Sequence, residues 1–249
     1  LSTSMLSAPA EATQGDKAAE YYANLCKMTV MWSASSFSNY LLNFLNKYLE
    51  GSIFMNNYFE GIAGMLAVFF GAHIYSKLGK RSAFVIAYSL ALLGGCLIYM
   101  LESGCINLPV SFLQSFAGTE KMRHTRAVAF LVPKVTFIAK FGIGLAFLFT
   151  YQASFSDEEL FPADVRATAI GTCQLFARAI TILAPEITEL PSPQPIMCFM
   201  LVAGTALIVA FTFSSKQTAP TPPASATPVV DRSLTDAQLL ALRLKEKAL

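Results

Sequence analysis

The chain has 249 residues, of which 54% are hydrophobic and 14% are charged, and its mean hydropathy is +0.51. Soluble domains carry about 25% charged residues, so this composition excludes an ordinary water-soluble fold and favours an integral membrane protein. The net charge of +2 is too small to indicate binding to nucleic acid.

Charged residues gather between long apolar runs, and a run of about 20 apolar residues spans a bilayer as a helix. The sequence therefore predicts an all-α membrane protein with six transmembrane helices. In chain order, these predicted spans are residues 28–49, 53–75, 83–101, 130–151, 166–185 and 196–213.

The predicted spans lie within a transmembrane domain of residues 28–214. A polar segment, residues 1–27, precedes it and holds no signal-peptide core. Because the first residue is Leu1, we expect a fragment of a longer protein or a processed product. A Pro/Ala/Thr-rich linker over 215–232 and a short amphipathic helix over 233–249 are predicted to follow the domain.

The first predicted span is rich in serine and asparagine. Asn39, Tyr40 and Asn43 fall on one helical face, which indicates a side buried in protein or facing a wet cavity. The second span contains Gly61 and Gly64, small residues that let helix backbones approach closely in membranes.

The fourth and fifth predicted spans each contain a basic residue near their middle, Lys140 and Arg178. A charge there costs roughly 2.5–3.5 kcal/mol, so such residues usually face a cavity or a partner. Both residues have a structural alternative: Lys140 snorkels or pairs with a carbonyl, and Arg178 pairs with Glu60. Lys134, nearer the end of its span, is expected to snorkel.

Basic residues in short loops set the orientation of membrane proteins. Lys77, Lys80 and Arg81 lie between the second and third spans, which predicts that this loop and the C-terminus are cytoplasmic. Lys121 and Arg126 fall on the other side and conflict with the rule. They lie in a longer loop, where the rule is weaker.

Two segments carry a resemblance to a known family. Residues 159–185 read ELFPADVRATAIGTCQLFARAITILAP, and residues 77–81 read KLGKR. The first resembles the junction of the tenth and eleventh helices of major facilitator transporters, closest to the organic cation, organic anion and carnitine transporter family. The second resembles the loop between the eighth and ninth helices of that family. The resemblance covers residues 28–213.

This resemblance implies the C-terminal six-helix half of a transporter, built as two inverted three-helix repeats. An N-terminal six-helix half, in the same longer chain or in a separate subunit, is then an expected partner. The family resemblance also implies a cytoplasmic charge network that gates the transporter. Its residues here are Glu159, Arg166, Lys77, Lys80 and Arg81. The family has Asp where this chain has Ser76, so one carboxylate of the network is absent.

The resemblance aligns Arg178 with the position at which organic anion transporters carry arginine. Lys140 aligns with a basic position of the tenth helix, so the two residues would form a cationic wall. The acidic position of the eighth helix falls on Gly64, with Glu60 one turn away. The expected substrate-binding residues are Arg178, Lys140, Tyr40, Glu60 and Asn39, and the aromatic candidates for the same cavity are Trp32, Tyr40, Phe147 and Tyr151.

The favoured function is therefore alternating-access transport of a small organic ion, preferably an anion, in the plasma membrane. The alternatives are a structural subunit of a membrane complex, a sugar-porter-like carrier and, less favoured, a channel. The sequence contains no catalytic motif, no CxxC pair and no Cys/His cluster, so we expect no enzyme, metal or cofactor.

Overall fold

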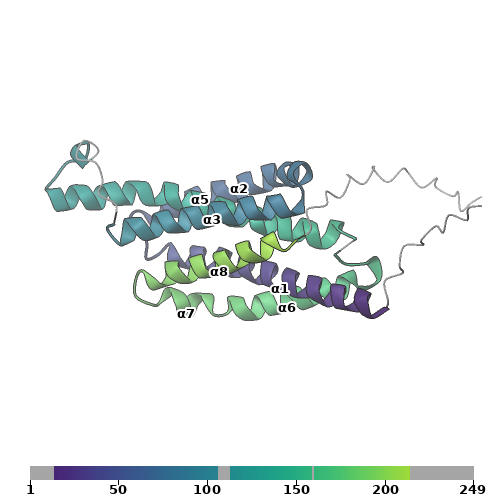
Figure 1. Cartoon of the computed structure of the whole chain (residues 1–249). Helices are drawn as coiled ribbons and strands as arrows, with labels where there is room; N and C mark the ends of the chain where they lie inside the picture. Colours follow the sequence, from purple (N-terminus) through teal and green to yellow (C-terminus); the bar gives the residue numbers. More distant parts are fainter. Residues whose placement is uncertain (1–13, 106–112, 159, 214–249) are drawn as a thin grey trace, which may run out of the picture. The chain divides into compact units, whose positions relative to one another are not determined.

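The computed structural model describes residues 14–105, 113–158 and 160–213, and the elements of this part are all helices. They are α1 (Gln14–Leu45), α2 (Ile53–Leu78), α3 (Lys80–Glu102), α5 (Glu120–Ser156), α6 (Ala163–Thr181), α7 (Ala184–Thr188) and α8 (Gln194–Phe211) (Figure 1). The all-α prediction is confirmed for these residues. The predicted linker, the C-terminal amphipathic helix and Glu159 lie outside them.

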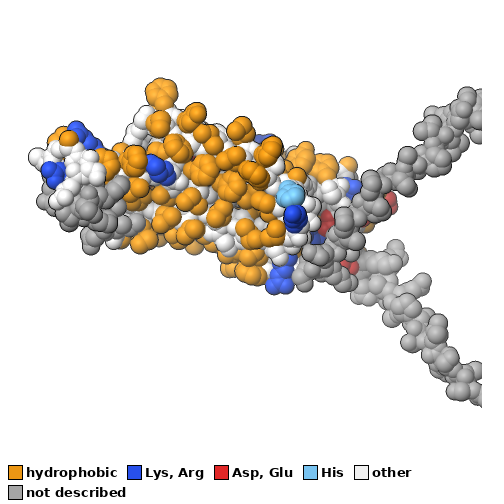
Figure 2. All heavy atoms as spheres, turned by 90° about the horizontal axis from the view of Figure 1, so that it is seen from above, with side chains coloured by type: hydrophobic (Ala, Val, Ile, Leu, Met, Phe, Trp, Pro, Cys, Tyr) orange, Lys and Arg blue, Asp and Glu red, His pale blue; other side chains and the backbone are white. Residues whose placement is uncertain are grey.

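Within the described residues, five helical segments are long and apolar enough to cross a membrane, and the first of the six predicted spans, which lies in α1, is not among them. They are α2, α3, α5, the combined segment Ala163–Thr188, and α8. Hydrophobic side chains cover most of the face in Figure 2, with charged side chains mostly toward its two ends. The chain thus has the helices of an integral multi-pass membrane protein.

The helix α1 differs from the other long helices because its polar side chains face inward. It packs against α5, α6, α7 and α8. Ser33, Ser35, Ser36 and Ser38 are all buried in these contacts. Polar residues are tolerated in a bilayer when protein surrounds them. This arrangement explains how a helix of low apolar content forms part of the bundle.

Two helices begin earlier than the apolar runs predict. α1 starts at Gln14 rather than near residue 28, and α5 starts at Glu120 rather than near residue 130. Apolarity marks the part of a helix that hydrocarbon surrounds. A helix satisfies its own backbone hydrogen bonds and continues past that boundary.

The span over residues 163–188 is broken between Thr181 and Ala184, within one turn of Arg178. α6 ends at Thr181, and the Ile182 N–H bonds the Arg178 carbonyl at 3.3 Å. Pro185 lies in the first turn of α7 and has no N–H to donate to Thr181. The helix therefore stops and restarts at this point, next to the polar face of α1.

The seam between α3 and α5 depends on glycine. A Cβ atom at Gly142 would lie 2.5 Å from the Ala91 nitrogen, and one at Gly94 would lie 2.4 Å from the Ala139 nitrogen. Both obstacles are backbone atoms, which cannot rotate away. The two helices therefore approach more closely than any side chain at these positions would allow.

Candidate functional site

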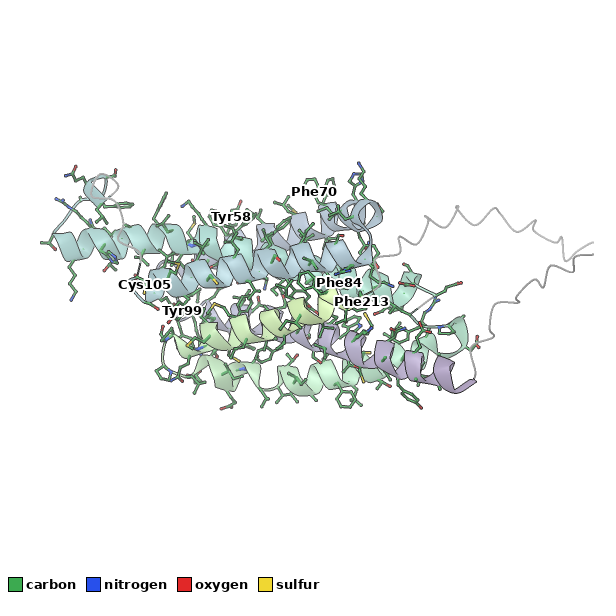
Figure 3. The ribbon with its side chains drawn as sticks, in the orientation of Figure 1. Tyr58, Phe70, Phe84, Tyr99, Cys105 and Phe213 are labelled. Atoms are coloured by element: carbon green, nitrogen blue, oxygen red, sulfur yellow. The ribbon has the colours of Figure 1, made fainter. Side chains whose placement is uncertain are left out.

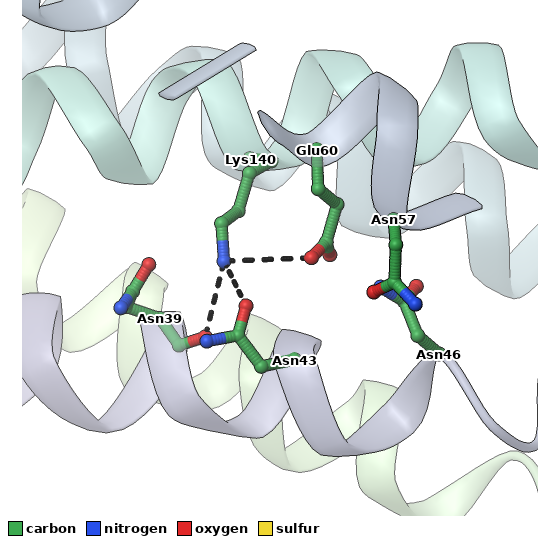
Figure 4. Close-up of polar contacts among 6 residues, drawn as sticks. All are labelled: Asn39, Asn43, Asn46, Asn57, Glu60 and Lys140. Carbon is green, nitrogen blue, oxygen red and sulfur yellow. Dashed lines mark hydrogen bonds and ion pairs between the residues drawn. The ribbon is translucent and has the colours of Figure 1, made fainter. Parts of the chain in front are cut away.

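A buried ion pair joins α2 and α5 near the middle of the bundle. The Lys140 Nζ atom lies 3.6 Å from Glu60 Oε2, and the two residues are 8% and 5% exposed. Figure 4 shows both side chains pointing into the space between their helices and α1. Pairing offsets part of the cost of holding each charge away from water. Glu60 thus pairs with Lys140, not with Arg178.

The Lys140 ammonium also bonds α1. It donates to the Asn39 backbone carbonyl at 3.4 Å and to the side-chain oxygen of Asn43. Lys140 therefore has two neutral acceptors in addition to the Glu60 carboxylate. Three helices meet at this one side chain.

Amides surround the carboxylate end of the pair. Asn46, just after α1, lies beside Glu60 and donates to Asn57 Oδ1 at 3.2 Å. Asn56, one turn before Glu60 on α2, is fully buried. Within the described residues, Glu60 Oε1 and the Asn56 amide atoms have no hydrogen-bond partner. The Glu60 carboxylate thus has fewer hydrogen-bond partners than the Lys140 ammonium has.

A pocket of about 220 Å³ opens between α1, α5 and α6. The lining residues are Trp32, Ser36, Phe147, Tyr151, Gln174, Ala177 and Arg178. The Trp32 ring packs edge-on against Phe147 and Tyr151, with a centroid distance of 5.7 Å in each case. Its Nε1 donates to Ser154 Oγ at 2.9 Å, which fixes the indole in the wall.

Arg178 lies at the edge of this pocket and is exposed. Its Nη1 donates to the Tyr40 hydroxyl at 3.1 Å, which is a neutral partner. No ion pair forms with Arg178 in the described part of the chain. The pocket thus combines aromatic walls with a guanidinium charge that no carboxylate in this part neutralises.

One face of the bundle holds both the pocket and the ion pair. Tyr40 and Asn39 are neighbours on α1, and they contact Arg178 and Lys140 respectively. On α5, Lys140 and Phe147 lie two turns apart on the same side, about 10 Å along the axis. Of the five residues predicted to bind substrate, Arg178 lines the pocket and bonds Tyr40 at its edge. The other three, Asn39, Lys140 and Glu60, belong to the neighbouring ion-pair cluster and not to the pocket wall.

A second buried ion pair lies at the opposite end of α2 from the loop that follows α1. Lys80, the first residue of α3, pairs with Asp157, which directly follows α5. The Lys80 ammonium also lies 6.0 Å from the centre of the Phe213 ring, which stacks on Phe84 at 5.5 Å. Figure 3 shows Phe84 and Phe213 side by side at this end.

The other members of the predicted cytoplasmic charge network have different partners. Arg166 donates to the backbone carbonyls of Phe161 and Phe155, at 3.2 and 2.9 Å, and so holds the turn between α5 and α6. Arg81 lies over the Phe211 ring at 5.8 Å, and Lys77 is exposed. Within the described residues, one member of the predicted network, Lys80, forms an ion pair, and its partner is Asp157.

Several residues of these sites were not predicted from the sequence, among them Asp157, Gln174, Ser36, Asn46 and Asn56. Gln174 precedes Arg178 by four residues, so helical spacing alone places both on one face. Asp157 belongs to the same acidic segment as Glu159, and the sequence does not tell which of the two carboxylates reaches α3.

Comparisons of this chain with protein families, with curated proteins and with solved structures find no match. What the site can do follows from its own residues and geometry.

Proposed function

We propose that this chain is half of an alternating-access transporter and that the Arg178 pocket binds a small organic anion. The observation that carries the proposal is the Arg178 guanidinium, which has only the neutral Tyr40 hydroxyl as its side-chain partner in the described residues, at the edge of an aromatic pocket. A charge inside a span is costly unless a partner or a wet cavity compensates it.

The pattern of helix contacts supports a half-transporter built from two repeats. α1 packs on α6 as α5 packs on α2, and α1 packs on α8 as α5 packs on α3. In this comparison α5 corresponds to α1, α6 to α2 and α8 to α3. Replacing each helix by its counterpart leaves these contacts unchanged. α1 and α5 also run in opposite directions (Figure 1). Inverted repeats of this kind are typical of secondary transporters, whose substrate sites lie between two such halves.

The chemistry of the pocket favours an aromatic carboxylate or sulfonate. The planar guanidinium of Arg178 suits two oxygens of one anionic group. Trp32, Phe147 and Tyr151 offer ring surfaces to an apolar body. The volume of about 220 Å³ is below the roughly 300–1,000 Å³ of complete ligand sites, which fits a site that a second half completes. The proposal places the protein in the plasma membrane with a cytoplasmic C-terminus.

Trp32 is the single tryptophan of the sequence and lines the pocket, so its fluorescence can report binding there. We expect phenylacetate to change the Trp32 emission of the detergent-purified chain saturably, and phenethylamine to bind at least about tenfold more weakly. The two probes share a ring and differ in the sign of their charge. Arg178→Gln removes a charged hydrogen-bond donor, so phenylacetate affinity should fall at least about tenfold.

Lys134→Gln is the matched control on the outer side of α5. The Lys134 ammonium bonds the Phe130 carbonyl of its own helix at 2.7 Å and does not line the pocket. This variant should bind phenylacetate as the parent does. Equal affinity for the two probes, or tight binding by Arg178→Gln, would refute an anion site. Absence of binding by either probe would favour the structural-subunit alternative.

A further inference from the structure

We infer that Gln174 makes a second polar contact with the substrate and selects aromatic carboxylates that carry a hydroxyl group at the para position of the ring. The inference rests on the proposed anion site and narrows its substrate class. Arg178 binds the carboxylate at one end of the pocket, and the Gln174 amide meets the hydroxyl at the other end. No covalent bond is made or broken.

Gln174 and Arg178 line the same pocket from the same helix. They are four residues apart on α6, so their side chains leave one face of the helix about 6 Å apart along its axis. The third lining residue of α6 is Ala177, whose methyl group is too small to separate a ligand from either neighbour. One ligand can therefore reach both residues at once.

The amide of Gln174 is available to a ligand. Gln174 is half-buried, and its amide makes no hydrogen bond with the residues that the structure describes. The hydroxyl of Ser36 in the same wall, by contrast, already bonds the Thr181 hydroxyl at 3.2 Å. A glutamine amide offers one acceptor and two N–H donors, and a phenolic hydroxyl both donates and accepts. The two groups are thus complementary.

The packing of α1 on α6 separates the two ligand-binding groups along the pocket. The two helices run in the same direction (Figure 1), and Ser36 of α1 meets Thr181 of α6. Tyr40 comes one turn after Ser36, so it lies past Thr181 in the direction away from Gln174. Because the Arg178 guanidinium bonds the Tyr40 hydroxyl, it also points away from Gln174. The guanidinium and the amide are therefore at least one helical turn apart.

A para-substituted benzene ring matches this separation. The ring holds para substituents on opposite sides, about one helical turn apart, whereas ortho substituents are adjacent. Trp32, Phe147 and Tyr151 line the same pocket and offer their rings to such a ligand. The para isomer alone then reaches Gln174 while its carboxylate stays on Arg178. A polar group enclosed without a partner costs free energy, so the para isomer binds more tightly.

The test compares two isomers of equal charge and composition. We expect 4-hydroxyphenylacetate to displace labelled phenylacetate from the detergent-purified chain with a dissociation constant at least about fivefold lower than that of 2-hydroxyphenylacetate. Each comparison uses one protein sample, so the ratio of the two constants does not depend on how much of the sample is folded.

Gln174→Leu removes the amide and keeps a side chain of similar bulk, so the preference for the para isomer should disappear. Gln174→Ser, which is polar but too short to reach the hydroxyl, should lose the preference as well. Gln194→Leu is the matched control. It makes the same substitution at the exposed start of α8, outside the pocket wall, and should keep the preference of the parent.

The two proposals fail in different ways. Equal affinity of the parent for the two isomers, or a preference that survives in Gln174→Leu and Gln174→Ser, overturns the role of Gln174 and leaves the anion site standing. Failure of the parent to bind phenylacetate at all refutes the anion site itself.

Discussion

Lys80 and Lys140 are both buried, and each lies beside a carboxylate from another segment of the chain. Lys140 is held by the amide-rich face of α1 in the middle of the bundle, whereas Lys80 is held against Asp157 and the Phe213 ring at one end. The first pair lies among the neutral amide groups of Asn39, Asn43 and Asn46. The second is packed among aromatic rings and has the character of a structural contact.

Lys80→Met tests the structural role of the second pair. It removes the ammonium that neutralises the buried Asp157 carboxylate, and breaking a buried pair in this way costs about 3 kcal/mol. We expect this loss in the equilibrium unfolding of the purified protein in mixed detergent micelles.

Lys47→Met is the control for this variant. It breaks the Lys47–Glu189 pair at 2.9 Å, whose side chains are 49% and 62% exposed. Exposed pairs contribute little, so its unfolding curve should overlay that of the parent. Equal losses in the two variants would show that burial of the Lys80 pair carries no special weight.

Single residues of the site were predictable where their chemistry is rare in a membrane. Arg178 and Lys140 stand out because charges inside spans are costly. Their partners were not predictable, because pairing depends on which helices pack together. From the sequence, Glu60 was a possible partner of Arg178. Because α2 packs on α5, Glu60 pairs with Lys140 instead.

At the scale of the helices, glycine sets how closely α3 and α5 approach each other. Gly142→Ala places a Cβ atom 2.5 Å from the Ala91 nitrogen and 2.8 Å from the Ala87 carbonyl oxygen. The helices must separate, so we expect a loss of about 2 kcal/mol in detergent unfolding.

Gly64→Ala is the matched substitution on α2, where a Cβ atom meets nothing within 4 Å. Alanine is the better helix former by about 0.5–1 kcal/mol, so this variant should be as stable as the parent or more stable. A destabilised Gly64→Ala together with an unchanged Gly142→Ala would contradict the packing of the seam.

The apolar helices could be predicted from hydropathy, and the polar parts of helices could not. α2, α3 and α8 lie close to their predicted spans. The first turns of α1 and α5 are polar, and no apolar run marks them. Pro185 falls at the end of a predicted span, yet the break between Thr181 and Ala184 emerges only from the structure.

For the whole transmembrane unit, the proposed orientation places the two ends of the bundle in different compartments. Cys26 is exposed, and its neighbour Lys27 donates to the Thr212 carbonyl at the end that also holds Lys80. Cys105 is exposed just after α3, at the other end (Figure 3).

Single-cysteine variants therefore report the orientation. In intact cells, a membrane-impermeant maleimide should label Cys105 and should label Cys26 only after permeabilisation. A variant retaining only Cys173, which is buried, should stay unlabelled in both conditions. Labelling of Cys26 in intact cells would show that this end faces outward, which contradicts the proposed topology.

The inward-facing serines of α1 also bear on how the chain enters the bilayer. A nascent α1 leaving the translocon has none of its later neighbours, α5, α6 and α8, to surround Ser33, Ser35 and Ser38. Polar groups are tolerated in the bilayer where protein surrounds them. We therefore expect α1 to reach its final position only after α5, α6 and α8 have been synthesised.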